Sequence, residues 1–303
     1  MRSRLASPLL LVFLFTLTVA QPATAQKKRL EPPPEPRPVM IPTKDGNELS
    51  GYYFGSNKGK EAIPVLLVHE WKGQKNGYGP LCLALRDAGC AVLAFDYRGH
   101  GGSREIVDGS GRKKQLNLQT MRKRDIETIV RYDIEAAKRW LIKENNEERL
   151  NLNALVVVGV RDGSVLATAW AQTDWQFPNI GSRKQGHDVK ALVFVSPKRQ
   201  LKGIPIESLL QDRNIAALPT MVIYGKGSSE ENDGERIHKR IGVNKRKLAG
   251  GLDPEGLELL AVAEPLGGPD LIKRSKKVIP EVVKFITEEV KISDIDNPWI
   301  KRD

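Results

Sequence analysis

The chain has 303 residues, a length that suits one α/β domain of ordinary size with additional sequence at its start. Its formal charge of +11 predicts attraction to polyanions such as cell-wall polymers, anionic lipid headgroups or nucleic acid. The spacing of Cys82 and Cys90 excludes the common metal and redox motifs. We expect two buried free thiols, with a disulfide between them as the alternative.

Residues 1–25 are predicted to be a secretory signal peptide. Two arginines lie near the start, residues 8–20 form a short apolar run, and residues 23–25 (Ala-Thr-Ala) resemble a cleavage signal. The apolar run is too short to span a bilayer comfortably, so an uncleaved anchor is the alternative. We therefore expect an exported protein, periplasmic or secreted, without a transmembrane anchor after cleavage. Loss of this segment lowers the formal charge from +11 to +9.

Residues 26–38 are proline-rich and charged, which predicts an extended linker before a domain over residues 39–303. In the domain, short apolar runs alternate with segments of helical periodicity. This order is typical of an α/β fold with a doubly wound, mostly parallel sheet. Strands are expected over residues 38–43, 48–55, 63–69, 91–96, 153–159, 189–196, 218–225 and 256–264. Helices are expected over residues 79–89, 126–141, 163–171 and 278–290.

Two stretches of the domain are strongly basic. Residues 236–247 carry no aromatic residue, so we expect a solvated helix face and no nucleic-acid partner; binding to a polyanionic envelope component is the alternative. Residues 112–125 are expected to form a solvated flap over the sheet edge. On the helix over residues 126–141, Asp133 lies in the apolar row, which predicts a buried, paired carboxylate.

Three segments resemble the α/β-hydrolase superfamily, particularly its dienelactone-hydrolase-like and serine-aminopeptidase-like members. Residues 65–73 (VLLVHEWKG) resemble the strand and loop that supply one oxyanion-hole amide. Residues 95–103 (FDYRGHGGS) are similar to the turn that follows the next strand, and residues 156–171 (VVVGVRDGSVLATAWA) to the nucleophile elbow. The likeness covers about residues 40–290 and implies the α/β-hydrolase fold, which by itself implies no activity.

A serine hydrolase of this fold requires a serine, then Asp or Glu, then a histidine along the chain. At the expected elbow, Gly159 and Gly163 place Arg161 in the centre, and a guanidinium stays protonated and cannot act as the nucleophile. The expected acid position holds Ser228, and the expected base loop, residues 264–272, has no histidine. These three positions predict a pseudo-hydrolase that binds a small ligand or a partner without catalysis.

Two alternatives belong to other functional classes. One is a hydrolase of ester or peptide-like substrates with rearranged residues, in which Asp162 or Ser103 acts with His69 or His100. An Asp162 nucleophile, as in haloalkane-dehalogenase-like relatives, would place bulky Val160 where the turn needs a small residue. The other is a basic scaffold held on the cell envelope. The chain has no zinc, dinucleotide or phosphate-loop motif, so no metal and no cofactor are expected.

A ligand site is expected at the carboxyl edge of the parallel strands, where open α/β sheets place their ligands. Its predicted residues are His69, Glu70, Trp71, Asp96, Arg161 and Asp162. A cation such as Arg161 is disfavoured at a helix N-terminus. We expect a salt bridge to Glu70 or Asp96 to offset this, or else that Arg161 and the helix N-terminus hold a small anionic ligand.

Overall fold

The computed structural model describes residues 31–178, 180 and 184–302. The predicted signal peptide lies outside the described residues, as do residues 26–30 of the predicted linker. The first strand begins at Arg37, just inside the stretch expected to be linker. None of the described helices is long and apolar enough to cross a membrane.

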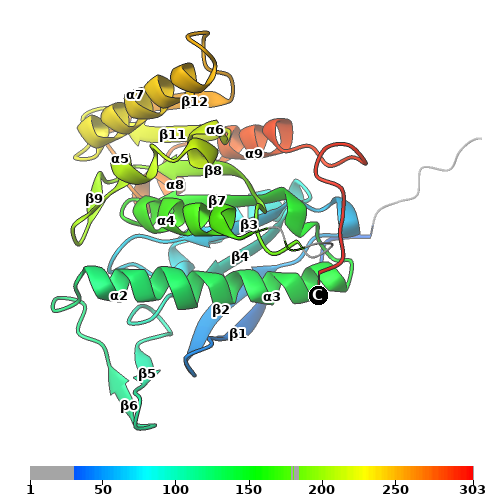
Figure 1. The fold of residues 1–303 in the computed structure, drawn as a ribbon, viewed down its shortest axis with the longest axis vertical. Coiled ribbons are helices and arrows are strands. Elements are labelled where there is room, and N and C mark those ends of the chain that lie inside the picture. Colours follow the sequence, from blue (N-terminus) through cyan, green and yellow to red (C-terminus); the bar gives the residue numbers. More distant parts are fainter. Residues whose placement is uncertain (1–30, 179, 181–183, 303) are drawn as a thin grey trace, which may run out of the picture. The chain divides into compact units, whose positions relative to one another are not determined.

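Eight strands form one sheet in the order β1-β2-β4-β3-β7-β8-β11-β12 (Figure 1). Their bounds are Arg37–Pro42 (β1), Glu48–Phe54 (β2), Pro64–Val68 (β3), Ala91–Phe95 (β4), Leu155–Val160 (β7), Val189–Val195 (β8), Thr220–Gly225 (β11) and Leu257–Val262 (β12). β2 pairs antiparallel with both β1 and β4, and every other pair in this sheet is parallel. The expected doubly wound, mostly parallel sheet is therefore confirmed.

Helices cover both faces of the sheet. They are Gly79–Asp87 (α1), Lys123–Thr128 (α2), Glu135–Asn146 (α3), Gly163–Gln176 (α4), Ile206–Leu209 (α5), Arg213–Ala217 (α6), Glu231–Leu248 (α7), Pro269–Arg274 (α8) and Val278–Glu289 (α9). The basic run over residues 236–247 lies on α7, and most of its cations are exposed as expected. Lys245 differs, because it is buried with Ile237 and Ile241 and donates from Nζ to the Ala217 carbonyl oxygen. α7, α4 and the α2–α3 helix are seen in Figure 1 along one side of the strands.

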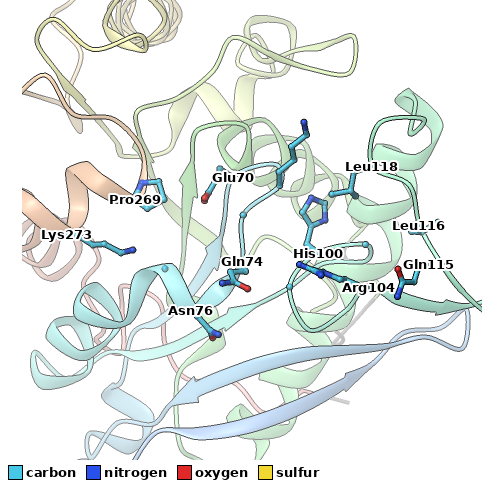
Figure 2. Close-up of a pocket in the computed structure, with 15 residues that line it drawn as sticks. Glu70, Gln74, Asn76, His100, Arg104, Gln115, Leu116, Leu118, Pro269 and Lys273 are labelled. Atoms are coloured by element: carbon cyan, nitrogen blue, oxygen red, sulfur yellow. The ribbon is translucent and has the colours of Figure 1, made fainter.

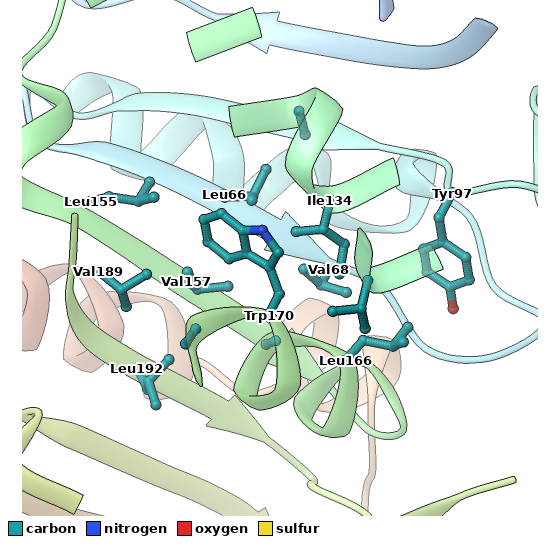
Figure 3. Packing of buried hydrophobic residues seen from close by; sticks show 14 of the residues in the cluster. Leu66, Val68, Tyr97, Ile134, Leu155, Val157, Leu166, Trp170, Val189 and Leu192 are labelled. Atoms are coloured by element: carbon teal, nitrogen blue, oxygen red, sulfur yellow. The ribbon is translucent and has the colours of Figure 1, made fainter. Parts of the chain in front are cut away.

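The core explains why the central strands are apolar throughout. Along β3, Val65 and Leu67 pack in the cluster that includes α1 and α9, whereas Leu66 and Val68 pack in the cluster that includes α3 and α4. A parallel strand buried on both faces has no position that favours a polar side chain. Figure 3 shows Trp170 of α4, which is fully buried, among side chains of β3 and β7.

Two segments differ from expectation. The helix expected over residues 126–141 is α2 and α3 joined by a π-helical turn, Ile129–Ile134, which positions the buried Asp133. The stretch expected to be a solvated basic flap, residues 112–125, begins inside a hairpin of β5, Glu105–Val107, and β6, Lys113–Gln115. A second small hairpin pairs β9, Gln200–Leu201, with β10, Ile204–Pro205.

Cys82 of α1 and Cys90, just before β4, are both buried and unpaired, which confirms the expected free thiols. Burial raises the pKa of each thiol to about 12. A buried thiol that stays protonated at neutral pH is chemically inert.

Candidate functional site

The turn between β7 and α4 has the geometry of a nucleophile elbow, and Arg161 is its central residue. Arg161 has a φ of 48°, in the left-handed region that side chains other than glycine rarely adopt. Its backbone N–H donates to the Val195 carbonyl oxygen at 2.9 Å, and its carbonyl oxygen accepts from the Ser164 N–H at 3.1 Å. The chain therefore leaves β7 and enters α4 within two residues.

Close approach of the backbone explains the two glycines of this turn. A Cβ on Gly159 would lie 2.6 Å from the Cα of Ser164, and one on Gly163 would lie 2.3 Å from the Val68 carbonyl oxygen. Asp162 has an ordinary φ of −63° as the N-cap residue of α4. The backbone thus excludes the alternative register with Asp162 at the centre. Burial raises the pKa of the Asp162 carboxyl.

The carboxylate nearest to Arg161 is Glu230, the N-cap residue of α7. Arg161 Nη2 lies 3.5 Å from Oε1 of Glu230, and Lys198 Nζ lies 3.0 Å from the same oxygen. Burial alone would raise the pKa of Glu230, but hydrogen bonds from Ser229 and Lys198 and the charge of Arg161 hold it below its usual value. The Glu230 side chain is only 2% exposed, so the carboxylate is shielded from water, whereas the Arg161 side chain is 36% exposed.

The expected pairing of Arg161 with Glu70 or Asp96 is therefore wrong. Both carboxylates have other partners: Glu70 accepts a hydrogen bond from the Tyr78 hydroxyl, and Asp96 accepts one from Lys75 Nζ at 2.7 Å. Both partners, Lys75 and Tyr78, lie in the 3-10 helix of the loop after β3.

The loop expected to carry a catalytic base packs directly on the ion pair. A Cβ on Gly267 would lie 2.1 Å from Oε2 of Glu230, and one on Gly268 would lie 2.5 Å from Nε of Arg161. Gly268 has a φ of 58°, and its N–H donates to the Ser196 hydroxyl at 2.8 Å. The guanidinium therefore fills the space between the elbow and this loop, and a side chain at either glycine would have to displace Glu230 or Arg161.

A second cluster lies beneath the loops that follow β3 and β4. His69 is fully buried and stacks on Tyr97, with ring centroids 4.3 Å apart. Its Nδ1 lies 2.7 Å from the Glu70 carbonyl oxygen, and its Nε2 lies 3.7 Å from Oδ1 of Asp96. Burial lowers the pKa of His69, so the ring is neutral at pH 7 and the ionic partner of Asp96 is Lys75. We conclude that the buried contacts of His69 and Asp96 hold the loop after β3 against the loop after β4.

The serine considered as a rearranged nucleophile also belongs to this internal network. The Ser103 hydroxyl donates to the Asp96 carbonyl oxygen at 2.7 Å and accepts from the Ser50 N–H at 2.9 Å. His100 Nδ1 instead faces the Arg98 carbonyl oxygen at 3.0 Å. The Ser103 backbone N–H donates to the His100 carbonyl oxygen at 2.7 Å, but within the described residues the Ser103 hydroxyl forms no hydrogen bond with the imidazole of His69 or His100.

Arg98 fastens the loop after β4 to the long helix. Its guanidinium forms two-pronged hydrogen bonds with Asp133, at 2.9 Å from Nε and 2.5 Å from Nη2, and a further pair with Asp45. Asp133 is fully buried, which confirms the expected buried and paired carboxylate. Burial raises the pKa of Asp133, although the charge and hydrogen bonds of Arg98 oppose this.

An open cleft of about 640 Å³ lies beside the buried cluster, at the carboxyl edge of the sheet (Figure 2). Its walls include Glu70, Lys72, His100, Arg104, Gln115 and Lys273. Of the predicted site residues, Glu70 alone lines it. Trp71 supports its wall, because the Trp71 ring packs edge-on against His100 with centroids 4.7 Å apart.

Solved structures of several hydrolases resemble most of the chain. An esterase of Pyrococcus furiosus, Pf2001, superposes with a TM-score of 0.58 at 18% identity, over 85% of this chain and 92% of the esterase. A dienelactone hydrolase of Anabaena variabilis gives 0.57 at 14% identity, over 86% of this chain and all of that chain (100%). This chain has the α/β-hydrolase fold.

Sequence comparisons identify no relative of known function for this chain. No family model matches the chain. It is 30% identical over 134 residues to the uncharacterised protein Rv2307c of Mycobacterium tuberculosis, which covers 42% of this chain and 41% of the relative. The chain thus matches about two fifths of the length of that relative. A thermostable carboxylesterase, EstE1, from a metagenomic library gives a TM-score of 0.58 at 16% identity, over 86% of this chain and 91% of EstE1, which shows the same fold and not its activity.

Within this α/β-hydrolase fold, the six predicted residues all lie at the carboxyl edge but in three environments. His69 and Asp96 are internal, Glu70 and Trp71 form or support the cleft wall, and the remaining two form the elbow. Sequence reasoning missed Glu230, Lys198, Lys75, Gly268 and Lys273. The signal for Glu230 was its place two residues after Ser228, which holds the position where this fold is expected to carry its acid.

Proposed function

We propose that this protein is a non-catalytic member of the α/β-hydrolase fold that binds a small ligand or a partner at the carboxyl edge of its sheet. One observation carries the proposal: Arg161 stands at the centre of the elbow and is held there by the buried Glu230. The guanidinium takes up the space in which a nucleophile and a base would have to meet.

The chemistry of acyl transfer supports this proposal. A serine hydroxyl is a weak nucleophile until an adjacent base removes its proton, and the base in turn needs a carboxylate partner. A guanidinium is not a nucleophile, Glu230 is engaged with Arg161 and Lys198, and a side chain at Gly267 or Gly268 would meet these two residues. A single missing catalytic residue can be replaced by a neighbour, whereas the joint loss of the nucleophile, the acid and the base argues for a different use of the site.

Covalent labelling tests the proposal most directly. We expect the full chain to give no adduct with a fluorophosphonate probe by intact mass spectrometry and to hydrolyse p-nitrophenyl acetate no faster than heat-denatured protein. A stoichiometric adduct on one serine, lost in a Ser103→Ala or Ser164→Ala variant, would overturn the proposal in favour of a hydrolase with rearranged residues.

We further propose that the protein is exported to the periplasm or secreted. The support is the sequence of residues 1–25, together with a basic composition suited to an envelope rich in polyanions. Mass spectrometry of protein made in an exporting bacterial host should find a mature chain that begins at Gln26. Recovery of the uncleaved chain in the cytosolic fraction would contradict it.

A further inference from the structure

The cleft at the carboxyl edge is lined by three cations from three separate segments. Lys72 follows β3, Arg104 lies in the loop after β4, and Lys273 lies on α8. Figure 2 shows Arg104 and Lys273 on opposite sides of the cleft. Within the described part of the chain, none of the three forms a salt bridge. Their charges are therefore available to a ligand that enters between them.

The single carboxylate in the cleft wall does not neutralise these cations. Glu70 accepts a hydrogen bond from the buried Tyr78 hydroxyl. Its carboxylate also lies against the backbone of Gly73, where a Cβ would be only 2.3 Å from the carboxyl carbon. Glu70 is thus turned back into its own loop, and the net charge of the cleft is positive.

A buried, unsatisfied polar atom in the same wall indicates a second kind of contact. The His100 side chain lines the cleft, and the residue is only 2% exposed. Since Nδ1 faces the Arg98 carbonyl oxygen, Nδ1 carries the proton and Nε2 is an acceptor. Nε2 is buried and has no hydrogen-bond partner in the described structure. An acceptor buried without a donor is unfavourable, and a ligand hydroxyl would satisfy it.

The remaining walls suit a polyhydroxylated molecule. Gln74, Asn76 and Gln115 present amides, which both donate to and accept from hydroxyl groups, while Leu116 and Leu118 offer an apolar surface to the face of a sugar ring. The volume of about 640 Å³ lies within the range of small-molecule sites.

We propose that this cleft binds an anionic sugar, whose phosphate or carboxylate lies between Arg104 and Lys273 and one of whose hydroxyls donates to Nε2 of His100. The proposal rests on the proposed function, in that the sugar is bound without being turned over. It adds to that function the chemical class of the ligand and the residues that recognise it.

Calorimetric titration of the full chain with four probes tests the ligand class. We expect glucose 6-phosphate and glucuronate to bind at least about tenfold more tightly than glucose, which lacks the charge, and about fivefold more tightly than inorganic phosphate, which has no sugar hydroxyl. Equal binding of glucose and glucose 6-phosphate, or of inorganic phosphate and glucose 6-phosphate, would overturn the assignment, as would no binding of any probe.

Variants test the location. Lys273→Gln and Arg104→Gln change exposed side chains, so both should fold, and each should weaken glucose 6-phosphate by about five- to tenfold. Lys239→Gln, on the exposed face of α7, is the matched control and should bind as the unchanged protein does. Unaltered binding in both cleft variants would place the ligand elsewhere and overturn the proposal.

The role of His100 has a readout that does not depend on a core substitution. In ¹⁵N-labelled protein, the His100 Nε2 resonance should shift with glucose 6-phosphate and stay in place with inorganic phosphate; no difference between them would exclude the hydroxyl contact. Failure of these titrations would overturn the sugar site but not the proposal that the protein is non-catalytic. A serine adduct in the labelling experiment would overturn the non-catalytic proposal but not sugar binding.

Discussion

Arg161 combines two unfavourable features that its neighbours offset. A left-handed backbone costs a residue with a side chain about 1–3 kcal/mol, and a cation at a helix N-terminus costs about 0.3–1 kcal/mol. The buried Glu230 supplies a charge-assisted contact, and Gly268 supplies the room for the guanidinium. The residue at the elbow and the residue in the base loop are therefore coupled sterically.

This coupling is measurable with a double-mutant cycle. Gly268→Ala should lower the free energy of unfolding by about 2–3 kcal/mol, because the new Cβ meets Arg161 Nε and the φ of 58° disfavours alanine. In an Arg161→Ala background the steric part disappears, so the same change should cost only about 1 kcal/mol in urea denaturation. Gly109→Ala, which meets no atom within 4 Å, is the control. Equal costs in both backgrounds would show that no coupling exists.

His100 makes stability depend on pH. Burial lowers its pKa from 6.5 to about 4, so below pH 6.5 the unfolded chain binds a proton that the folded chain does not. The stability contributed by the neutral ring is complete above pH 6.5 and is lost as the pH falls toward about 4. Between pH 7 and pH 5 this loss is about 2 kcal/mol. Urea denaturation at pH 7 and pH 5 should show that the free energy of unfolding falls less in His100→Gln than in the unchanged protein. An equal fall in both proteins would show that His100 is not the source of the pH dependence.

At the scale of elements, the π-helical turn between α2 and α3 serves the loop after β4. It positions Asp133, which then holds Arg98 by three side-chain hydrogen bonds and the Arg98 N–H by a fourth, at 2.9 Å. That loop continues into His100 and Arg104 of the cleft. The irregular helix is thus a structural support of the candidate site.

Removal of the Asp133 charge should destabilise the protein strongly. Asp133→Asn keeps the shape of the side chain but leaves the buried Arg98 with only Asp45, whose side chain is 28% exposed. Loss of one partner of a buried ion pair costs about 3–5 kcal/mol, and we expect the lower end because Asp45 remains. Chemical denaturation measures the change, with Glu127→Gln on the exposed side of α2 as a control expected within about 0.5 kcal/mol. A loss below 1 kcal/mol for Asp133→Asn would show that the pair is dispensable.

The sequence predicts the elements that a buried sheet demands and misses those that tertiary contacts decide. β3 could be predicted because a strand buried on both faces is apolar at every position. α9 could be predicted because a helix packed on the sheet needs one apolar face. β6 could not, since Lys113–Gln115 is polar, exposed and without alternation. Likewise, the glycines of the elbow predict Arg161 at its centre, whereas its partner Glu230 comes from another strand–helix connection and no local pattern links them.

At the scale of the molecule, the carboxyl and amino edges of the parallel strands carry different groups of residues. The carboxyl edge carries the elbow and the cleft, whereas the amino edge holds a buried charge cluster around Asp188, which directly precedes β8. Lys138 Nζ lies 2.5 Å from Asp174 and 3.0 Å from Asp188. The C-terminal segment closes this edge: Asn145, Asn151 and Asn153 donate from their side chains to its backbone carbonyls.

Arg302 completes this cluster, and its neighbour provides a matched control. Arg302 is 5% exposed, pairs with Asp188 and donates to the Lys184 carbonyl oxygen at 2.9 Å. The neighbouring Lys301 is exposed. Arg302→Gln should therefore lower the free energy of unfolding by about 3 kcal/mol and Lys301→Gln by less than about 0.5 kcal/mol. Because the cluster lies at the amino edge, folded Arg302→Gln should bind glucose 6-phosphate as the unchanged protein does. Weakened binding in calorimetry at a temperature where the variant is folded would show instead that the two edges are coupled through the strands.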